Sequence, residues 1–344
     1  MRHINIPIFI PHLGCPNQCV FCNQRSISGV KEFNPDEIDK IIIESLSTAE
    51  QEDEVEIAFF GGSFTGIDRE MMVALLDKAY VYVKAGRVSA IRCSTRPDYI
   101  SEEILAILRE RGVKVIELGL QSSSDEVLKL TKRGHDSECE LRACKMIVES
   151  GFTLVGQMMI GLPGSDEESE IKTAELIISS GAKGARIYPT VVFKDTELCC
   201  MAESRDYIPL TVDEAVRRSA KVFSMFLDNN VEVIRIGLCS SENLVSDNTY
   251  HSGPNHPALG ELVLNEYYFS KISDEIRKCN LSGTDKIKIK VAPGRLSSAI
   301  GQRKRNKLLL SESFPHTAFS FAEDGGLYGF DISVEKTIGD TKCT

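Results

Sequence analysis

Short runs of β-branched and other apolar residues alternate with helical stretches along the first two thirds of this chain. The runs predict strands at residues 4–10, 55–60, 89–94, 113–120, 152–160, 184–190 and 231–238. Helical patterns lie between them at residues 36–47, 69–85, 101–111, 136–150, 166–180 and 212–229. Strands that alternate with helices form parallel sheets with right-handed crossovers. Six or seven such units favour an α/β barrel, complete or partial, over a small open sheet.

The composition is that of an ordinary folded protein, since 42% of the 344 residues are hydrophobic and 26% are charged. The N-terminus lacks a signal-peptide pattern, and no apolar run approaches the roughly 20 residues of a membrane helix. Eleven cysteines in a chain of this size do not make a disulfide scaffold, which predicts a reducing, cytoplasmic location. The net charge of −10 disfavours a protein that coats nucleic acid non-specifically.

Three cysteines follow the first predicted strand in a C-x3-C-x2-C arrangement: Cys15, Cys19 and Cys22. Three thiolates on one loop can hold one metal centre, but structural zinc and ordinary iron–sulfur sites usually take four protein ligands. A 4Fe–4S cluster held by three cysteines therefore leaves one iron open to a small molecule. Two alternatives stay open. Either His12 completes a zinc site with the three cysteines, or the cysteines are buried free thiols.

Polar and glycine-containing phrases lie at the carboxyl ends of the next predicted strands, where barrels of this kind carry their chemistry. They include Gly61-Gly62-Ser63 after the second strand, Ser94 at the end of the third, Gln121 after the fourth, and Gln157 in the fifth. Two successive glycines let the backbone approach a ligand closely.

These phrases, together with the cysteine triplet, resemble the radical S-adenosylmethionine (SAM) superfamily. Residues 117–122, 156–164 and 187–190 are similar to the radical SAM half of the Elongator catalytic subunit, without its acetyltransferase domain, and more distantly to oxygen-independent coproporphyrinogen oxidase. The resemblance implies a partial (β/α)6-type TIM barrel. It also implies that SAM is cleaved at a 4Fe–4S cluster to a 5′-deoxyadenosyl radical that abstracts hydrogen. The electron would come from a donor of the flavodoxin or ferredoxin type.

The resemblance also implies roles for individual residues. The cluster would be held by Cys15, Cys19 and Cys22, with Phe21 beside the adenine of SAM. The amino group of SAM would be bound by the segment Gly61-Gly62-Ser63. Its ribose and carboxylate would contact Gln121 and Arg133. Ser94 and Gln157 occupy positions where the porphyrin-pathway relatives keep a glutamate and an aspartate, and as hydrogen-bonding groups they would also contact SAM.

The resemblance covers residues 5–240, so we expect a core barrel over 1–240, a lid or linker over 241–280 and a small basic α+β domain over 281–344. The segment 240–257 is rich in Ser, Asn, Gly and His, which is typical of a loop. His251 and His256 would be proton donors or substrate anchors if this loop covers the barrel mouth. The alternative is a surface loop that caps a helix at 258–279.

The last segment departs from the acidic average. Residues 286–307 contain eight cations and no acid: Lys286, Lys288, Lys290, Arg295, Arg303, Lys304, Arg305 and Lys307. Residues 291–304 resemble the core of a K-homology module, which clamps RNA with a G-x-x-G loop. Lys304 replaces the second glycine, so contact with phosphates by charge is the expected mode. A solvated cationic face is the alternative.

We therefore predict a radical SAM enzyme whose substrate is RNA, with tRNA as the leading candidate. Two other classes remain open: a haem-handling or non-catalytic iron–sulfur protein on the same fold, and a zinc-containing RNA-binding scaffold. The remaining cysteines, including Cys139, Cys144, Cys199, Cys200 and Cys279, show no ligand spacing with one another. We expect them to be structural, although Cys199, Cys200 and Cys239 follow late strands where a hydrogen-atom donor could lie.

Overall fold

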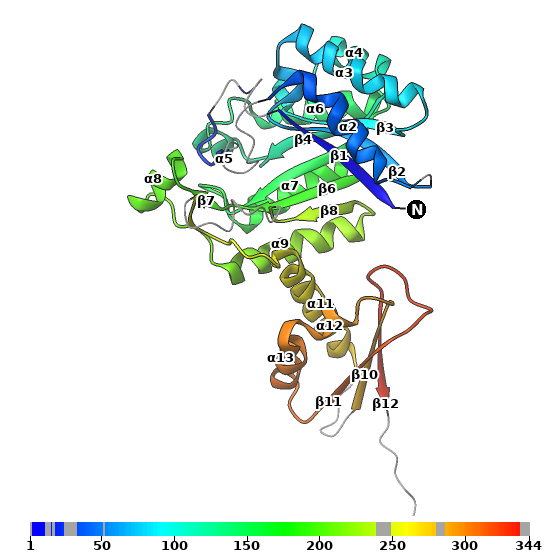
Figure 1. The fold of residues 1–344 in the computed structure, drawn as a ribbon. Coiled ribbons are helices and arrows are strands. Elements are labelled where there is room, and N and C mark those ends of the chain that lie inside the picture. Colours follow the sequence, from blue (N-terminus) through cyan, green and yellow to red (C-terminus); the bar gives the residue numbers. More distant parts are fainter. Residues whose placement is uncertain are drawn as a thin grey trace, which may run out of the picture. The chain divides into compact units, whose positions relative to one another are not determined.

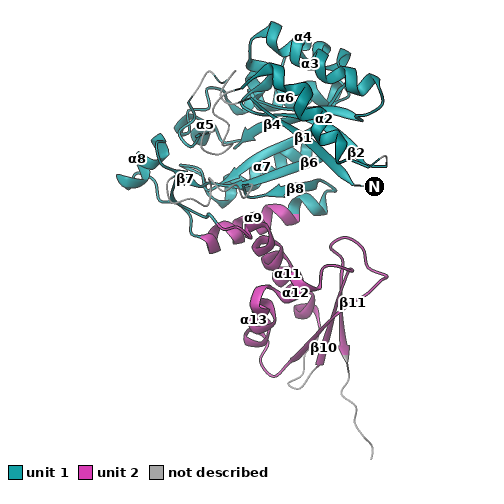
Figure 2. Ribbon diagram, viewed as in Figure 1, with its two compact units in different colours: residues 1–211, 225–255 teal, residues 212–224, 256–344 magenta. Residues whose placement is uncertain are grey.

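The computed structural model describes residues 2–10, 15, 18–23, 33–50, 52–238, 249–279 and 286–337. The chain forms two compact units, one of residues 1–211 and 225–255 and one of residues 212–224 and 256–344 (Figure 2). In this division the first part of helix α9 (Val212–Asp228) belongs to the second unit, and the chain passes to that unit again between residues 255 and 256.

The first unit contains a seven-stranded parallel sheet that curls into a half-barrel (Figure 1). Its strands are β1 (His3–Ile10), β2 (Glu54–Gly61), β3 (Ala90–Thr95), β4 (Val113–Gln121), β5 (Thr153–Ile160), β6 (Gly184–Pro189) and β8 (Glu232–Ile236). They lie side by side in that order. The seven predicted strands are confirmed to within two residues at each end, and so is the partial barrel.

Helices connect these strands, as the parallel pairing requires. They are α2 (Ile38–Ser47), α3 (Arg69–Lys84), α4 (Glu102–Glu110), α5 (Asp125–Leu130), α6 (Ser137–Glu149), α7 (Glu167–Ser179), α8 (Glu197–Glu203) and α9. Short 3-10 turns lie at η1 (Pro35–Glu37), η2 (Phe64–Gly66) and η3 (Pro97–Tyr99). The six predicted helices are confirmed. The periodicity did not reveal α5 and α8, because six or seven residues are too few to show it.

Side-chain caps and left-handed glycines fix the ends of several helices. Asp136 accepts a hydrogen bond from the N–H of Cys139 at the start of α6, and Asp166 begins α7 with a capping box. Gly112 and Gly151, just past α4 and α6, have φ angles of +75° and +82°. Glycine adopts this left-handed conformation without steric cost, which is why it commonly follows the end of a helix.

A second, two-stranded sheet follows the carboxyl end of β6. Strand β7 (Val192–Phe193) pairs antiparallel with β9 (Tyr250–Ser252). Part of the segment expected to be a lid is therefore a strand that pairs with the chain just after β6. Residues 239–248 of that segment, including Cys239, lie outside the described residues.

The second unit is a small α+β structure, as predicted. It contains α11 (Leu259–Lys278), β10 (Lys286–Val291), α12 (Leu296–Ile300), η4 (Gln302–Lys304), α13 (Arg305–Ser313), β11 (Ala318–Glu323) and β12 (Ile332–Thr337). Strand β10 is central, parallel to β11 and antiparallel to β12. Phe223, Tyr267 and Phe330 form edge-to-face aromatic contacts inside this unit, with ring centroids 5.2 and 5.3 Å from Phe223.

Candidate active site

The cysteine-bearing segment follows β1 and is anchored from two sides. The N–H of Val20 donates to the carbonyl of Thr131 at 3.2 Å, and the carbonyl of Val20 accepts from the N–H of Leu198 at 2.8 Å. A turn joins Cys22 to Cys19 through an N–H to carbonyl bond of 3.0 Å. Cys15, Cys19 and Cys22 are all free thiols, and Cys19 is buried. His12 lies outside the described residues.

Two buried arginines converge on the sulfur of Cys19. Arg133 places Nη1 3.4 Å from Sγ, and Arg96 places Nη1 at 3.8 Å. Arg96 also donates to the carbonyl of Arg133 and forms a 2.9 Å ion pair with Asp98. The two guanidiniums place positive charge beside this sulfur, and the thiolate is the form of cysteine that ligates metals.

Cys15 lies next to the glycine phrase at the end of β2. The backbone N–H of Ser63 donates to its sulfur. Burial raises the pKa of the Cys15 thiol, while this hydrogen bond and the charge of Arg96 act against the increase. The family resemblance implied that Ser63 binds SAM, and the structure brings Ser63 to the cysteine.

Gly61 allows a close approach between two strand ends. It has a φ angle of +118°, and a Cβ atom added there would lie 2.8 Å from the carbonyl oxygen of Ile10. The N–H of Gly62 donates to the same carbonyl at 3.1 Å. Because Ile10 ends β1, this contact helps fix where the cysteine segment begins.

Gln121 presents a buried acceptor at the end of β4. Its φ angle is +73°, in the left-handed region that non-glycine residues rarely adopt. Its Oε1 atom is buried and receives no hydrogen bond from the described residues. Buried polar atoms normally have partners, so a ligand with a hydroxyl or amine donor fits this position.

Gln157 and Ser94 lie deeper, beside a buried carboxylate. Gln157 donates Nε2 to Glu117 at 3.0 Å, and Ser94 pairs with Glu117 in the sheet. Glu117 is 1% exposed and also accepts from Arg92 and Arg186, at 3.0 and 2.9 Å. In this structure, therefore, the Gln157 side chain binds a neighbouring strand's carboxylate.

Phe21 is half-buried and packs against an apolar cluster made of Val20, Val192, Leu198, Cys199 and Tyr207. The sequence analysis assigned no role to Arg96 or Glu117. Arg96 was detectable in principle, because it directly follows a strand end where polar groups meet. Glu117 was not, because one carboxylate within an apolar strand does not reveal its partners.

The basic segment of the second unit is only partly a free cationic surface. Lys290 forms ion pairs with Glu335 and Asp324 at 2.5 and 3.6 Å, so this cation of β10 is engaged by acids within the same unit. Glu335 lies in β12, and Asp324 directly follows β11. Both acids lie outside residues 286–307, so the count of charges over that segment did not include them. Arg295 stacks on Phe330, 4.3 Å from the ring centroid.

The loop that replaces the G-x-x-G phrase adopts a glycine-like backbone. Arg303 and Lys304 have φ angles of +53° and +63°, and Gly301 has +81°. Among the described residues, no ion pair engages Arg303, Lys304 or Lys307, and all three are exposed. Arg305 pairs with Asp213 at 3.3 Å. The exposed cations therefore gather at this loop and at the start of α13.

The half-barrel and the cysteine segment at its strand ends define a class of protein. The model of the Radical SAM superfamily matches residues 9–177, and that of the Radical_SAM C-terminal domain matches residues 182–268. The chain belongs to the radical SAM superfamily and is an enzyme of that class. The described residues include no helix long and apolar enough to cross a membrane.

Two curated relatives show the sequence similarity to the Elongator catalytic subunit and to tRNA uridine(34) acetyltransferases. A tRNA uridine(34) acetyltransferase of Methanocaldococcus infernus is 35% identical over 133 residues, which are 38% of this chain and 25% of the relative. Human Elongator complex protein 3 is 28% identical over 232 residues, 62% of this chain and 41% of its own. The chain thus spans about a quarter to two fifths of these two curated relatives.

Solved structures show the same fold. The structure of Elp3 from Methanocaldococcus infernus covers 83% of this chain and 66% of its own, with a TM-score of 0.62 at 22% identity. Coproporphyrinogen III oxidase of Escherichia coli, the more distant resemblance, covers 78% of this chain with a TM-score of 0.49. The expected likeness to the radical SAM part of the Elongator catalytic subunit is confirmed.

The family implies a 4Fe–4S cluster and SAM, and the residues present are compatible with both. The triplet supplies three free thiols, one of them between two guanidiniums. The buried Oε1 atom of Gln121, which receives no hydrogen bond from the described residues, can accept one from a polar ligand.

Proposed function

We propose that this enzyme cleaves SAM reductively at a 4Fe–4S cluster held by Cys15, Cys19 and Cys22, and that its substrate is an RNA. A cluster held by these three thiolates would supply the one-electron reduction of SAM, with the electron taken from a flavodoxin- or ferredoxin-type donor, for hydrogen abstraction from the substrate. The observation that carries the proposal is the convergence of Arg96 and Arg133 on the Cys19 sulfur beside strand ends that meet at one edge.

The chain's own residues bind and orient the reactants. Arg133 and Arg96 balance the negative charge that a thiolate-bound cluster brings into a buried site. Gln121 accepts a hydrogen bond from the ribose of SAM through its unpartnered Oε1. Ser63 fixes Cys15 through its N–H, and Gly61 lets the end of β1 approach.

RNA is supported as the substrate class by two observations. Two curated relatives of this chain are named tRNA uridine(34) acetyltransferases. Independently, three exposed cations that form no ion pair within the described part of the chain gather in and after a loop with glycine-like backbone geometry, at Arg303, Lys304 and Lys307. Cations so placed hold phosphates by charge, which makes binding strongly salt-dependent.

The test is whether bulk tRNA increases 5′-deoxyadenosine formation by the reconstituted, anaerobic enzyme. The test variant carries Arg303→Gln, Lys304→Gln and Lys307→Gln, which remove the three exposed cations of the loop and of α13. A matched control carries Lys40→Gln, Lys145→Gln and Lys172→Gln, three exposed lysines on helices of the first unit. We expect stimulation in the parent and the control, and its loss in the first variant. Equal rates with and without tRNA in the parent would contradict an RNA substrate.

A further inference from the structure

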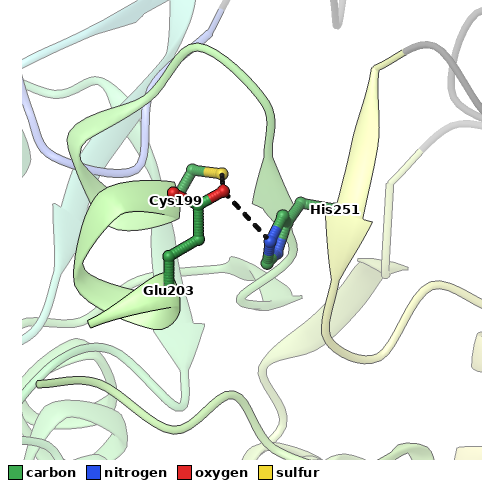
Figure 3. Close-up of side chains that lie close together, drawn as sticks. All are labelled: Cys199, Glu203 and His251. Carbon is green, nitrogen blue, oxygen red and sulfur yellow. Dashed lines mark hydrogen bonds and ion pairs between the residues drawn. The ribbon is translucent and has the colours of Figure 1, made fainter. Parts of the chain in front are cut away.

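A cysteine, a glutamate and a histidine meet beside the cysteine segment but outside the proposed cluster site. Cys199 and Glu203 are four residues apart on α8, so their side chains share one face of the helix. The Sγ of Cys199 lies 3.8 Å from Oε1 of Glu203, and Nε2 of His251 lies 3.7 Å from the same oxygen (Figure 3). All three ligand atoms lie within 4.8 Å of one another.

An irregularity in the small sheet places His251 toward the helix. Strands β7 and β9 pair Val192 with Ser252 and Phe193 with Tyr250, so His251 is the extra residue of a bulge. Bulges often turn a side chain toward a site. The Nδ1 atom of His251 is 2.8 Å from the hydroxyl of Ser252, which holds the ring and leaves Nε2 facing Glu203.

The helix that carries the other two groups is fixed just as closely. Thr196 caps α8 by accepting from the N–H of Cys199 at 3.1 Å, and its hydroxyl donates to the carbonyl of Phe193 at 2.6 Å. The N–H of Leu198 donates to the carbonyl of Val20. The helix is therefore tied both to β7 and to the segment that carries Cys19 and Cys22.

From this geometry we infer that Cys199, Glu203 and His251 bind one zinc-type divalent cation, at a site distinct from the cysteine triplet. Thiolate sulfur, imidazole nitrogen and carboxylate oxygen are the donors that zinc prefers in proteins. With metal–ligand distances of about 2.0–2.3 Å, tetrahedral ligands lie roughly 3.3–3.5 Å apart, so small side-chain rotations close this set. Three protein ligands leave the fourth position to water or a substrate atom, the arrangement of catalytic rather than structural zinc.

The surroundings suit such a site. Cys199 is 7% exposed, whereas the side chain of Glu203 is 64% exposed and that of His251 28%, so a cation can enter from solvent. On binding, the thiol releases its proton to water and coordinates as the thiolate. Burial and the nearby Glu203 raise the pKa of Cys199, so the thiolate is disfavoured without a metal. A bound divalent cation favours the thiolate by its positive charge.

Cobalt(II) is the probe, because its bond to a thiolate gives a charge-transfer band in the near ultraviolet and its visible bands report tetrahedral geometry. The full chain carries Cys15→Ser, Cys19→Ser and Cys22→Ser so that the triplet cannot bind the metal. We expect one equivalent of cobalt with the charge-transfer band. The band should disappear with Cys199→Ser and remain with Cys200→Ser, which alters the adjacent, exposed cysteine. His251→Gln should lose tetrahedral binding, and Ser252→Ala should weaken the affinity about tenfold.

Thermal melting of each metal-free variant checks that it is folded. As a second measurement that keeps the triplet intact, elemental analysis of the iron-reconstituted parent should give about one zinc per chain more than Cys199→Ser. An unchanged cobalt spectrum in folded Cys199→Ser, or equal zinc in the two proteins, would overturn the inference. The cobalt assay contains neither SAM nor reductant, so its failure is distinguishable from failure of the proposed SAM cleavage.

Discussion

The guanidinium of Arg133 lies 3.4 Å from the sulfur of Cys19, although 114 residues separate the two in the sequence. Arg133 also donates to the carbonyl of Gly119 in β4, so its position is set by the sheet. The contact links the cysteine segment to the carboxyl end of a strand that also carries Gln121. It thereby connects the proposed cluster ligand with the proposed SAM contacts.

Replacing Arg133 should impair SAM cleavage more than replacing the neighbouring, exposed Lys132. A hydrogen bond to a charged group contributes about 1.5–3 kcal/mol, so Arg133→Gln should lower kcat/KM for SAM roughly 10- to 100-fold. Lys132→Gln is the matched control, because it removes the same charge from a side chain that is 57% exposed. Steady-state formation of 5′-deoxyadenosine measures both. Equal losses in the two variants would show that only the net charge matters.

Gly61→Ala should destabilise the protein far more than a glycine substitution in open space. At Gly61 a Cβ meets the Ile10 carbonyl oxygen at 2.8 Å, whereas at Gly151, with φ of +82°, nothing lies within 4 Å. A left-handed conformation alone costs about 1–2 kcal/mol for an L-residue, which is the expected loss for Gly151→Ala. Gly61→Ala should exceed it by about 2 kcal/mol. Urea unfolding of both variants tests this, and similar losses would argue against the tight contact.

Glu117→Gln should be among the most destabilising single changes in the barrel. It leaves the buried guanidiniums of Arg92 and Arg186 without their shared carboxylate, at a cost of about 3–5 kcal/mol. Glu138→Gln is the control, since this glutamate is 84% exposed and 3.7 Å from Arg142. That exposed pair should change the free energy of unfolding by under about 1 kcal/mol. A mild effect at Glu117 would mean that water or rearrangement satisfies both arginines.

The protein should lose stability as the pH falls from 6.5 toward 4, in part through His135. Burial and then Arg133 lower the pKa of His135 from 6.5 to about 4. The unfolded chain therefore binds a proton in this window that the folded chain does not, so stability present above pH 6.5 is lost on acidification. Between pH 7 and pH 5, the parent should lose more unfolding free energy than His135→Gln. Glu140 lies 3.1 Å from His135, and burial raises the pKa of its carboxyl group. Because the parent and His135→Gln both contain Glu140, equal losses in the two proteins would assign the pH effect to groups other than His135.

Much of the fold was predictable from local patterns. The seven strands and six helices follow from apolar periodicity, because each element buries one face or one run of its own residues. Gly112 and Gly151 mark two helix ends in the sequence, because a helix end that needs a left-handed residue favours glycine. The sequence did not predict the short elements β7, α8 and β9, because two to seven residues are too few to show a periodic pattern of apolar residues.

The site was predictable only where spacing is local. Cys15, Cys19 and Cys22 lie within eight residues, so the sequence shows them as a group. Arg96 and Arg133 reach Cys19 through the sheet, and no local pattern reports such a distance. The meeting of Cys199 and His251 depends on a bulge in β9, which follows from the pairing register and not from either residue's neighbours.

The central claim is tested most directly by 5′-deoxyadenosine release when the anaerobically reconstituted protein meets SAM and dithionite. Cys19→Ala removes the buried cysteine between Arg96 and Arg133, and Cys139→Ala removes a cysteine outside the triplet as a control. The account predicts release by the parent and by Cys139→Ala, and none by Cys19→Ala. Undiminished release from Cys19→Ala, or a parent that holds zinc in place of iron at the triplet and cleaves no SAM, would contradict it.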